Sequence, residues 1–214
     1  MKKVVILLAF IMVGTLAFAQ VDLGEHSFVS GRWTVSGDRL YQNDETARLA
    51  KVNIKTPQEG LMIYEFDARY EGGTEDGHGG FGLHFFVDES FDRISWGAGS
   101  SFLLWLNYDE NPINKEIPAG LSAQLYRSRS NSVMDLIESI DLNHYAEFLT
   151  DEYLSNPVTF KIIVNGNNGE IWVYDPTEDD DTYYILDLDT NFLPLSGDWV
   201  VLRTNGIKLS FSFF

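Results

Sequence analysis

Residues 60–87, GLMIYEFDARYEGGTEDGHGGFGLHFFV, contain two stretches of alternating apolar and polar residues, separated by a glycine-rich acidic loop. Side chains that alternate with a period of two lie on opposite faces of a β-strand, and an apolar face indicates burial against a core. In the first stretch the apolar face holds Met62, Tyr64, Phe66, Ala68 and Tyr70. In the second stretch it holds Phe81, Leu83, Phe85 and Val87. The pattern predicts two neighbouring β-strands packed on the core of the fold.

The opposite faces of these two strands are rich in ionisable groups. Glu65, Asp67 and Arg69 alternate with the apolar residues of the first strand, and His84 does so in the second. If the two strands pair side by side, these four residues share one polar face of a sheet. So many ionisable groups on one surface make this face the first candidate for a functional site.

The N-terminus has the pattern of a secretory signal peptide. Lys2 and Lys3 precede an apolar run, and Ala17 and Ala19 supply the small residues of a cleavage site. We therefore expect residues 1–19 to be removed, leaving residues 20–214 as a single domain that is secreted or periplasmic. No later stretch has the ~18 successive apolar residues that a transmembrane helix needs, so we expect no membrane span after cleavage.

Composition excludes some partners. The chain has 15 basic against 32 acidic residues and a net charge of -17. A nucleic acid would be repelled at long range, and no cluster of lysine or arginine reverses that repulsion locally. The chain has no cysteine, so an exported fold must be stabilised by packing, for which 14% aromatic residues supply large side chains.

The rest of the chain predicts more strands separated by turn residues. Candidate strands lie at 32–35, 39–42, 47–55, 102–108, 121–127, 158–164, 170–174, 183–188, 199–203 and 207–213. Region 132–142 is predicted as a strand, although Ser132 and Asp135 could also begin a helix, and one short helix is predicted at 144–149. About a dozen strands with hardly any helix indicate an all-β antiparallel sandwich.

The order of these segments resembles one fold family. WTVSGDRL (33–40), YEFDARYEGG (64–73) followed by GFGLHFF (80–86), and the hairpin VTFKIIVNGNNGEIWVYD (158–175) are similar to the concanavalin A-like jelly rolls. That family includes laminin-G-like domains and related carbohydrate-binding and sugar-hydrolase modules. The resemblance implies two packed curved sheets and a concave face that often receives glycans. It also implies that a structural calcium is sometimes present.

Two interpretations of the carboxylate row remain. Some jelly-roll glycosidases carry E-x-D-x-E on one strand, and retaining hydrolysis needs two carboxyl groups about 5 Å apart. Here Arg69 takes the place of the third carboxylate, with Glu71 one step further along the same face. The chain therefore does not have that mechanism in its usual form, and a salt-bridged ladder on a solvated sheet is the alternative.

Sugar binding adds residues from two more predicted strands. A sugar presents apolar C–H patches and many hydroxyls, so its site combines aromatic rings with carboxylates and amides. If the strands at 102–108 and 121–127 are neighbours, four more side chains join Glu65, Asp67, Arg69 and His84 as candidate ligand-binding residues: Trp105, Asn107, Gln124 and Tyr126. Trp105 lies within the apolar run FLLWL, so burial in the core is its alternative.

No established metal or catalytic motif is present. The four histidines do not have zinc-ligand spacing. The acidic runs at Asp88–Glu89 and 178–181 carry oxygen ligands that suit calcium, but without a defined spacing. We predict a non-catalytic, exported glycan-binding sandwich that needs no cofactor. The alternatives are a structural or interaction protein of the cell envelope, such as a coat or sheath subunit, and a glycoside hydrolase with a displaced carboxylate pair.

Overall fold

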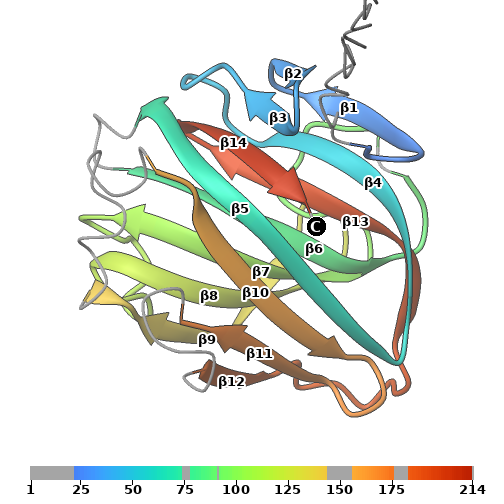
Figure 1. The fold of residues 1–214 in the computed structure, drawn as a ribbon. Coiled ribbons are helices and arrows are strands. Elements are labelled where there is room, and N and C mark those ends of the chain that lie inside the picture. The colour runs from blue at the N-terminus through green and yellow to red at the C-terminus, as the bar shows by residue number, and fades with distance from the viewer. Residues whose placement is uncertain (1–21, 74–77, 91, 144–155, 176–182, 214) are drawn as a thin grey trace, which may run out of the picture.

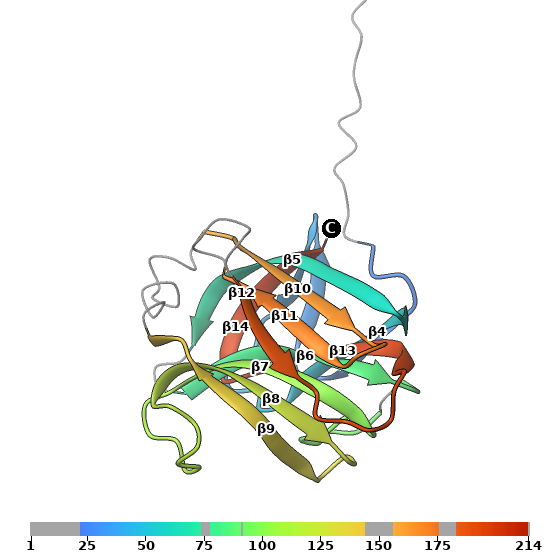
Figure 2. The same ribbon diagram turned by 90° about the horizontal axis from the view of Figure 1, so that it is seen from below.

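A computed structural model of the chain describes residues 22–73, 78–90, 92–143, 156–175 and 183–213. These residues form two antiparallel seven-stranded sheets, which Figure 2 shows as separate layers. The predicted signal peptide and the predicted helix at 144–149 lie outside the described residues. Within the described ranges, no helix is long and apolar enough to cross a membrane.

The first sheet, sheet A, has the strand order β1-β4-β13-β6-β7-β8-β9. Its strands are β1 (His26–Ser30), β4 (Ala50–Glu59), β13 (Ser196–Asn205), β6 (His78–Val87), β7 (Ser101–Asp109), β8 (Gly120–Ser128) and β9 (Met134–Asp141). The strand β9 confirms the strand prediction for region 132–142.

The second sheet, sheet B, has the strand order β12-β11-β10-β5-β14-β3-β2. Its strands are β12 (Tyr183–Asp187), β11 (Glu170–Tyr174), β10 (Val158–Asn165), β5 (Leu61–Gly73), β14 (Ile207–Phe213), β3 (Arg39–Gln42) and β2 (Trp33–Ser36). In Figure 1 this sheet lies nearer the viewer, with β5 and β10 drawn across the strands of sheet A. The all-β jelly-roll sandwich predicted from the sequence is confirmed.

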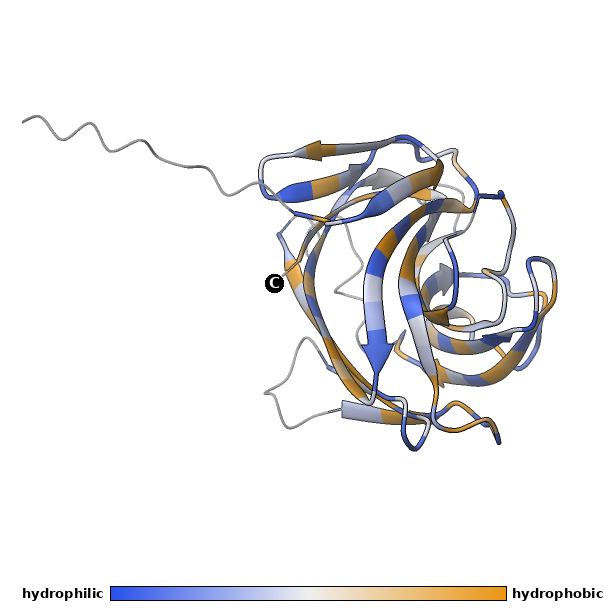
Figure 3. Cartoon of the chain, turned by 90° about the vertical axis from the view of Figure 1, so that its right-hand side faces the viewer, coloured by the Kyte–Doolittle hydropathy of each residue, from blue (hydrophilic) through white to orange (hydrophobic). Residues whose placement is uncertain are grey.

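Rings from both sheets fill the space between them. Phe66 of β5 lies 6.3 Å from Phe81 of β6, measured between ring centroids, and 5.7 Å from Phe160 of β10. Phe211 of β14 joins the same group, 5.7 Å from Phe81. Each such ring contributes about 1.5–3 kcal/mol by leaving water. The strands accordingly alternate between hydrophobic and hydrophilic residues along their length (Figure 3).

The predicted pairing of β5 with β6 is wrong. Strand β5 pairs with β10 and β14 in sheet B, whereas β6 pairs with β7 and β13 in sheet A. The alternating pattern shows which face of a strand is buried, but a partner beside the strand and a partner across the core satisfy it equally. Phe66 and Phe81 meet across the core, so the polar faces of β5 and β6 point to opposite sides of the molecule.

The predicted inward position of Val87 is also wrong. The register of β6 against β13 slips between Val201–His84 and Trp199–Val87, which leaves an extra residue on β6. Phe86 in this bulge has a φ of 57°. Phe85 and Phe86 both enter the main core, and Val87 turns to the outer face of sheet A, where it packs with Val201.

Candidate functional site

The structure divides the predicted ligand-binding residues into two groups. Glu65, Asp67 and Arg69 lie on the outer face of sheet B. The other group lies on the outer face of sheet A, on the neighbouring strands β6, β7 and β8: His84, Trp105, Asn107, Gln124 and Tyr126. The prediction that β7 and β8 are neighbours is confirmed, but the single polar face that joined both groups does not exist.

The group on sheet B forms a polar ladder. The carboxylate of Asp67 accepts a 2.6 Å hydrogen bond from the Thr159 hydroxyl. The Arg69 Nε donates to Glu71 over 2.8 Å, and this bond raises the pKa of Arg69. Glu71 also accepts from the Ser210 hydroxyl over 2.6 Å. These contacts match the ladder that the sequence left as the alternative to a carboxylate pair.

The group on sheet A is largely buried. The exposed fraction is 0% for His84, 2% for Gln124 and 6% for Trp105. The Tyr126 hydroxyl donates to the side-chain Oε1 of Gln124 over 2.7 Å, and the Gln124 Nε2 donates to the Ser122 hydroxyl over 2.8 Å. Burial, followed by the charges of Lys51 and Arg203, lowers the pKa of His84 well below 6.5. His84, Gln124 and Trp105 are covered parts of the sheet, whereas Asn107 and Tyr126 are half-buried.

Residues 92–100 lie on the outer face of sheet A. Two basic side chains attach this stretch to the sheet. Lys51 Nζ donates to the Gly97 carbonyl over 2.6 Å, and Arg203 Nη1 donates to the Trp96 carbonyl over 2.9 Å. Ala98 packs under the segment against Val87, in a small apolar cluster separate from the main core.

The contact with Arg203 holds the aromatic side chain of Trp96 at the surface. The Arg203 guanidinium carbon lies 4.7 Å from the ring centroid of Trp105 and 5.1 Å from that of Trp96. Burial lowers the pKa of Arg203 to about 10, so the group stays charged at neutral pH and attracts both ring faces. Trp105 is the buried base of this arrangement, and Trp96 is 59% exposed at its surface.

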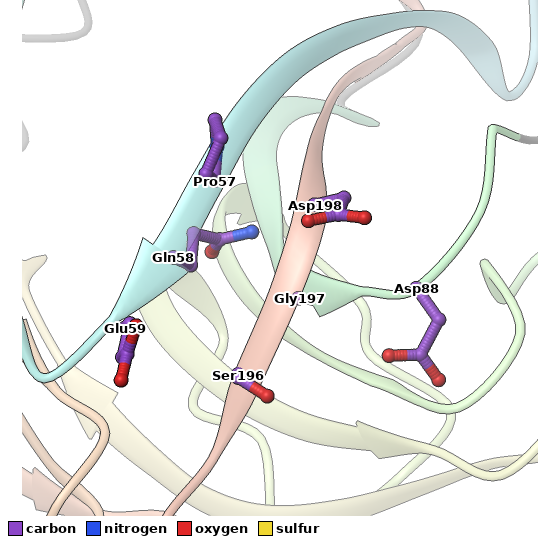
Figure 4. A pocket seen from close by; sticks show the side chains of 7 residues that line it. All are labelled: Pro57, Gln58, Glu59, Asp88, Ser196, Gly197 and Asp198. Carbon is purple, nitrogen blue, oxygen red and sulfur yellow. The ribbon is translucent and has the colours of Figure 1, made fainter.

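A cavity of about 330 Å³ lies where β4 ends and β13 begins (Figure 4). Carboxylates of Glu59, Asp88 and Asp198 and the Ser196 hydroxyl line it. Its remaining wall is rigid, because the Gln58 amide donates to the Trp199 carbonyl over 2.8 Å. Figure 4 shows the acidic side chains on three different chain segments around this space.

A second cavity of about 330 Å³ opens on the other side of Asp88, against residues 92–100. Its polar lining includes Asp88, Glu89 and Asp92 together with Ser90, Ser100 and Asn131. Asn131 is fixed, since its side-chain oxygen accepts from the Gly99 N–H over 3.1 Å. We call the two cavities together with Trp96 the Asp88 site.

The Asp88 site has the groups that bind hydroxyls. Its carboxylate and amide oxygens accept hydrogen bonds, its serines both donate and accept, and Trp96 offers an apolar ring face. Among the described residues, no three acidic or histidine side chains are placed to hold a metal ion. The second acidic run considered for calcium, 178–181, lies outside the described residues.

Sequence reasoning missed Trp96 as an aromatic contact and considered Asp88 only as a calcium ligand. The signal was present in S95-W96-G97-A98-G99, where a lone tryptophan stands among small residues in a segment without strand alternation. Because such a segment has no buried strand face, an aromatic side chain in it is expected to be exposed to solvent.

The comparisons with known proteins identify the fold. No protein-family model matches the chain, and none of the curated proteins matches it. Among solved structures, the chain is similar to the carbohydrate-binding module CBM66 from Bacillus subtilis, with a TM-score of 0.53 and 16% identity over 87% of this chain and 91% of that one. At the level of the fold, the chain matches the concanavalin A-like jelly rolls.

Two further structures agree with this match. The exoplasmic/lumenal domain of VIP36 has a TM-score of 0.55 and 11% identity over 89% of this chain and 84% of that one. The CBM2 module of the evolved Dit protein of Lactobacillus casei BL23 phage J-1 has a TM-score of 0.54 and 10% identity over 92% of both chains. At such identities the similarity extends to the fold and no further.

Proposed function

We propose that the protein is an exported, non-catalytic glycan-binding module whose ligand lies at the Asp88 site. The observation that carries the proposal is the pair of cavities around Asp88, lined with carboxylates and hydroxyls, together with the exposed ring of Trp96 in the stretch that also lines the second cavity. Two of the similar structures are named as carbohydrate-binding modules, which supports a glycan as the ligand class.

The chemistry of the site suits the binding of a sugar. Asp88 and Asp198 are exposed, and no hydrogen bond or ion pair joins either of them to another described residue. Carboxylate oxygens accept hydrogen bonds from hydroxyl groups, and the two cavities offer several of them to a sugar. The C–H face of the same sugar can stack on Trp96.

The first experiment is a glycan array with the mature protein, residues 20–214, in the presence and absence of calcium. We expect binding to a defined glycan class, unchanged when calcium is removed. Trp96→Ala should weaken that binding at least tenfold, a loss of about 1.4 kcal/mol, and Asp88→Asn should weaken it as well.

Phe192→Ala is the matched control, because Phe192 is an exposed aromatic residue outside the site. It should bind as the unmodified protein does. An array without any signal would refute glycan binding, whereas a signal that survives Trp96→Ala would place the ligand elsewhere on the molecule.

A further inference from the structure

An apolar row crosses the outer face of sheet B. The register pairs Ile63 of β5 with Ile163 of β10, Ile163 with Trp172 of β11, and Trp172 with Ile185 of β12. Directly paired residues point to the same face of a sheet. An outward face is expected to be polar, so four apolar side chains in one line across four strands need an explanation.

The row is exposed and ordered. Ile63 is 59% exposed and Ile185 is 55% exposed. Trp172 stacks on Tyr183, with ring centroids 5.2 Å apart and an interplanar angle of 10°. No described element crosses this face, which Figure 1 shows in front of the other sheet. A contiguous apolar surface of this kind marks an interaction site.

The rows on either side of it have different chemistry. On one side, Glu65 pairs with Lys161, and Tyr174 pairs with Tyr183. The ammonium of Lys161 lies 4.7 Å from the centroid of the Tyr174 ring. On the other side, Leu61 pairs with Asn165, Asn165 with Glu170, and Glu170 with Asp187.

These rows complement each other under a two-fold rotation, and we propose that this face binds a second copy of the same chain. A two-fold axis along the apolar row brings each of its residues against itself in the second copy and places one flanking row opposite the other. Tyr183 then faces Asp187 of the second copy, and Tyr174 faces Glu170. Hydroxyl donors thereby meet carboxylate acceptors, while the flanking acidic residues do not meet each other.

The size of the face predicts a weak dimer. Four strands about 4.8 Å apart and three rows about 7 Å apart, with side-chain margins, cover roughly 400 Å² per copy. Stable interfaces bury about 800 Å² per partner, so association should appear only at high concentration. Because each chain has a net charge of -17, added salt should screen the repulsion between copies and strengthen an interface held by apolar contact.

Sedimentation equilibrium tests this from about 5 to about 500 µM protein, at about 0.05 and about 0.5 M NaCl. We expect a monomer–dimer equilibrium that shifts toward dimer in high salt. Ile185→Asp should weaken association at least tenfold while leaving glycan binding at the Asp88 site unchanged. Ile94→Asp is the charge-matched control, because Ile94 is an exposed isoleucine in the segment on sheet A.

A single cysteine tests the orientation, since the chain has none of its own. The two-fold axis places Ile163 against Ile163 of the second copy, so Ile163→Cys should form a disulfide-linked dimer on oxidation, and Ile94→Cys should do so far less. A chain that stays monomeric at about 500 µM, or equal cross-linking of the two variants, overturns the proposal. In the first case the face would belong to a different protein.

Discussion

Lys51 is a buried cation whose lowered pKa makes the stability of the fold depend on pH. Its side chain is fully buried on β4, where the ammonium donates to the Gly97 carbonyl. Burial, and to a smaller degree the charge of Arg203, lowers the pKa of Lys51 from 10.5 to about 7. The unfolded chain keeps its proton up to pH 10.5, so between about pH 7 and 10.5 the unfolded state binds more protons than the folded state.

The sign and size of the change in unfolding free energy with pH follow from this difference in bound protons. Stability rises with pH wherever the unfolded state binds more protons, by up to about 1.4 kcal/mol per pH unit for one group. Between pH 7 and 9 the free energy of unfolding should therefore rise by about 2–3 kcal/mol because of Lys51 alone. Lys51→Met has a similar volume and no charge, and it should lose this part of the rise.

The assay is urea unfolding followed by tryptophan fluorescence at several pH values from about 6.5 to 9. The quantity of interest is the difference between the original chain and Lys51→Met, because groups common to both cancel. Lys55→Met is the control: this exposed lysine pairs with Glu25, which raises its pKa, so its contribution stays constant in this range. A constant difference between the original chain and Lys51→Met would refute a titrating Lys51.

Three further predictions concern the two outer faces. Gly82→Ala should cost about 3 kcal/mol in urea unfolding, because a Cβ there would collide with the Leu104 carbonyl and the Trp105 ring. Gly24→Ala, which meets no neighbour at a φ of +58°, should cost only about 1 kcal/mol, and equal losses would argue against the collision. Arg203→Met should leave the Trp96 carbonyl unpaired and make the fluorescence of Trp96 easier to quench with acrylamide. Arg93→Met is the control, because Arg93 is exposed, and it should leave the quenching unchanged. Unchanged quenching in both variants would show that Arg203 does not hold the Trp96 ring. Glu65→Ala should leave glycan binding unchanged, because Glu65 lies on the sheet opposite the Asp88 site, and it should change the free energy of unfolding by less than about 0.5 kcal/mol. Loss of glycan binding in this variant would show that the ligand binds on sheet B.

The sequence was sufficient for most of the strands, although it missed β1, but it was not sufficient for their partners. Period-two alternation correctly placed Phe66 and Ala68 inward on β5, because burial on one face leaves a direct trace in the sequence. The choice between a partner beside β5 and a partner across the core leaves no such trace. The error placed His84 on the same face as Glu65, whereas the structure puts the two residues on opposite sides of the molecule and divides the predicted site in two.

Burial of an outward face is a second quantity that alternation does not record. Trp105 and Gln124 point outward as predicted, yet both are covered. Arg203 lies over the ring of Trp105. Arg203 and Lys51 also donate hydrogen bonds to carbonyls of residues 92–100, a stretch that has no regular pattern. Such bonds depend on backbone geometry in three dimensions, so the residue types of the segment do not predict them.

Lys51 and Arg203 donate to backbone carbonyls of this stretch, at Gly97 and Trp96, and not to its carboxylates. Had Lys51 and Arg203 been paired with carboxylates, Asp88 and Glu89 would have been drawn inward and neutralised. Instead the cations hold the backbone at Trp96 and Gly97, and the acidic side chains remain at the surface around the cavities. A rigid backbone with exposed acceptors loses little conformational freedom when a ligand binds. Under the proposed function, these two bonds would hold the Asp88 site ready for a polyhydroxylated ligand, and the bond from Lys51 keeps that cation buried at a cost in stability.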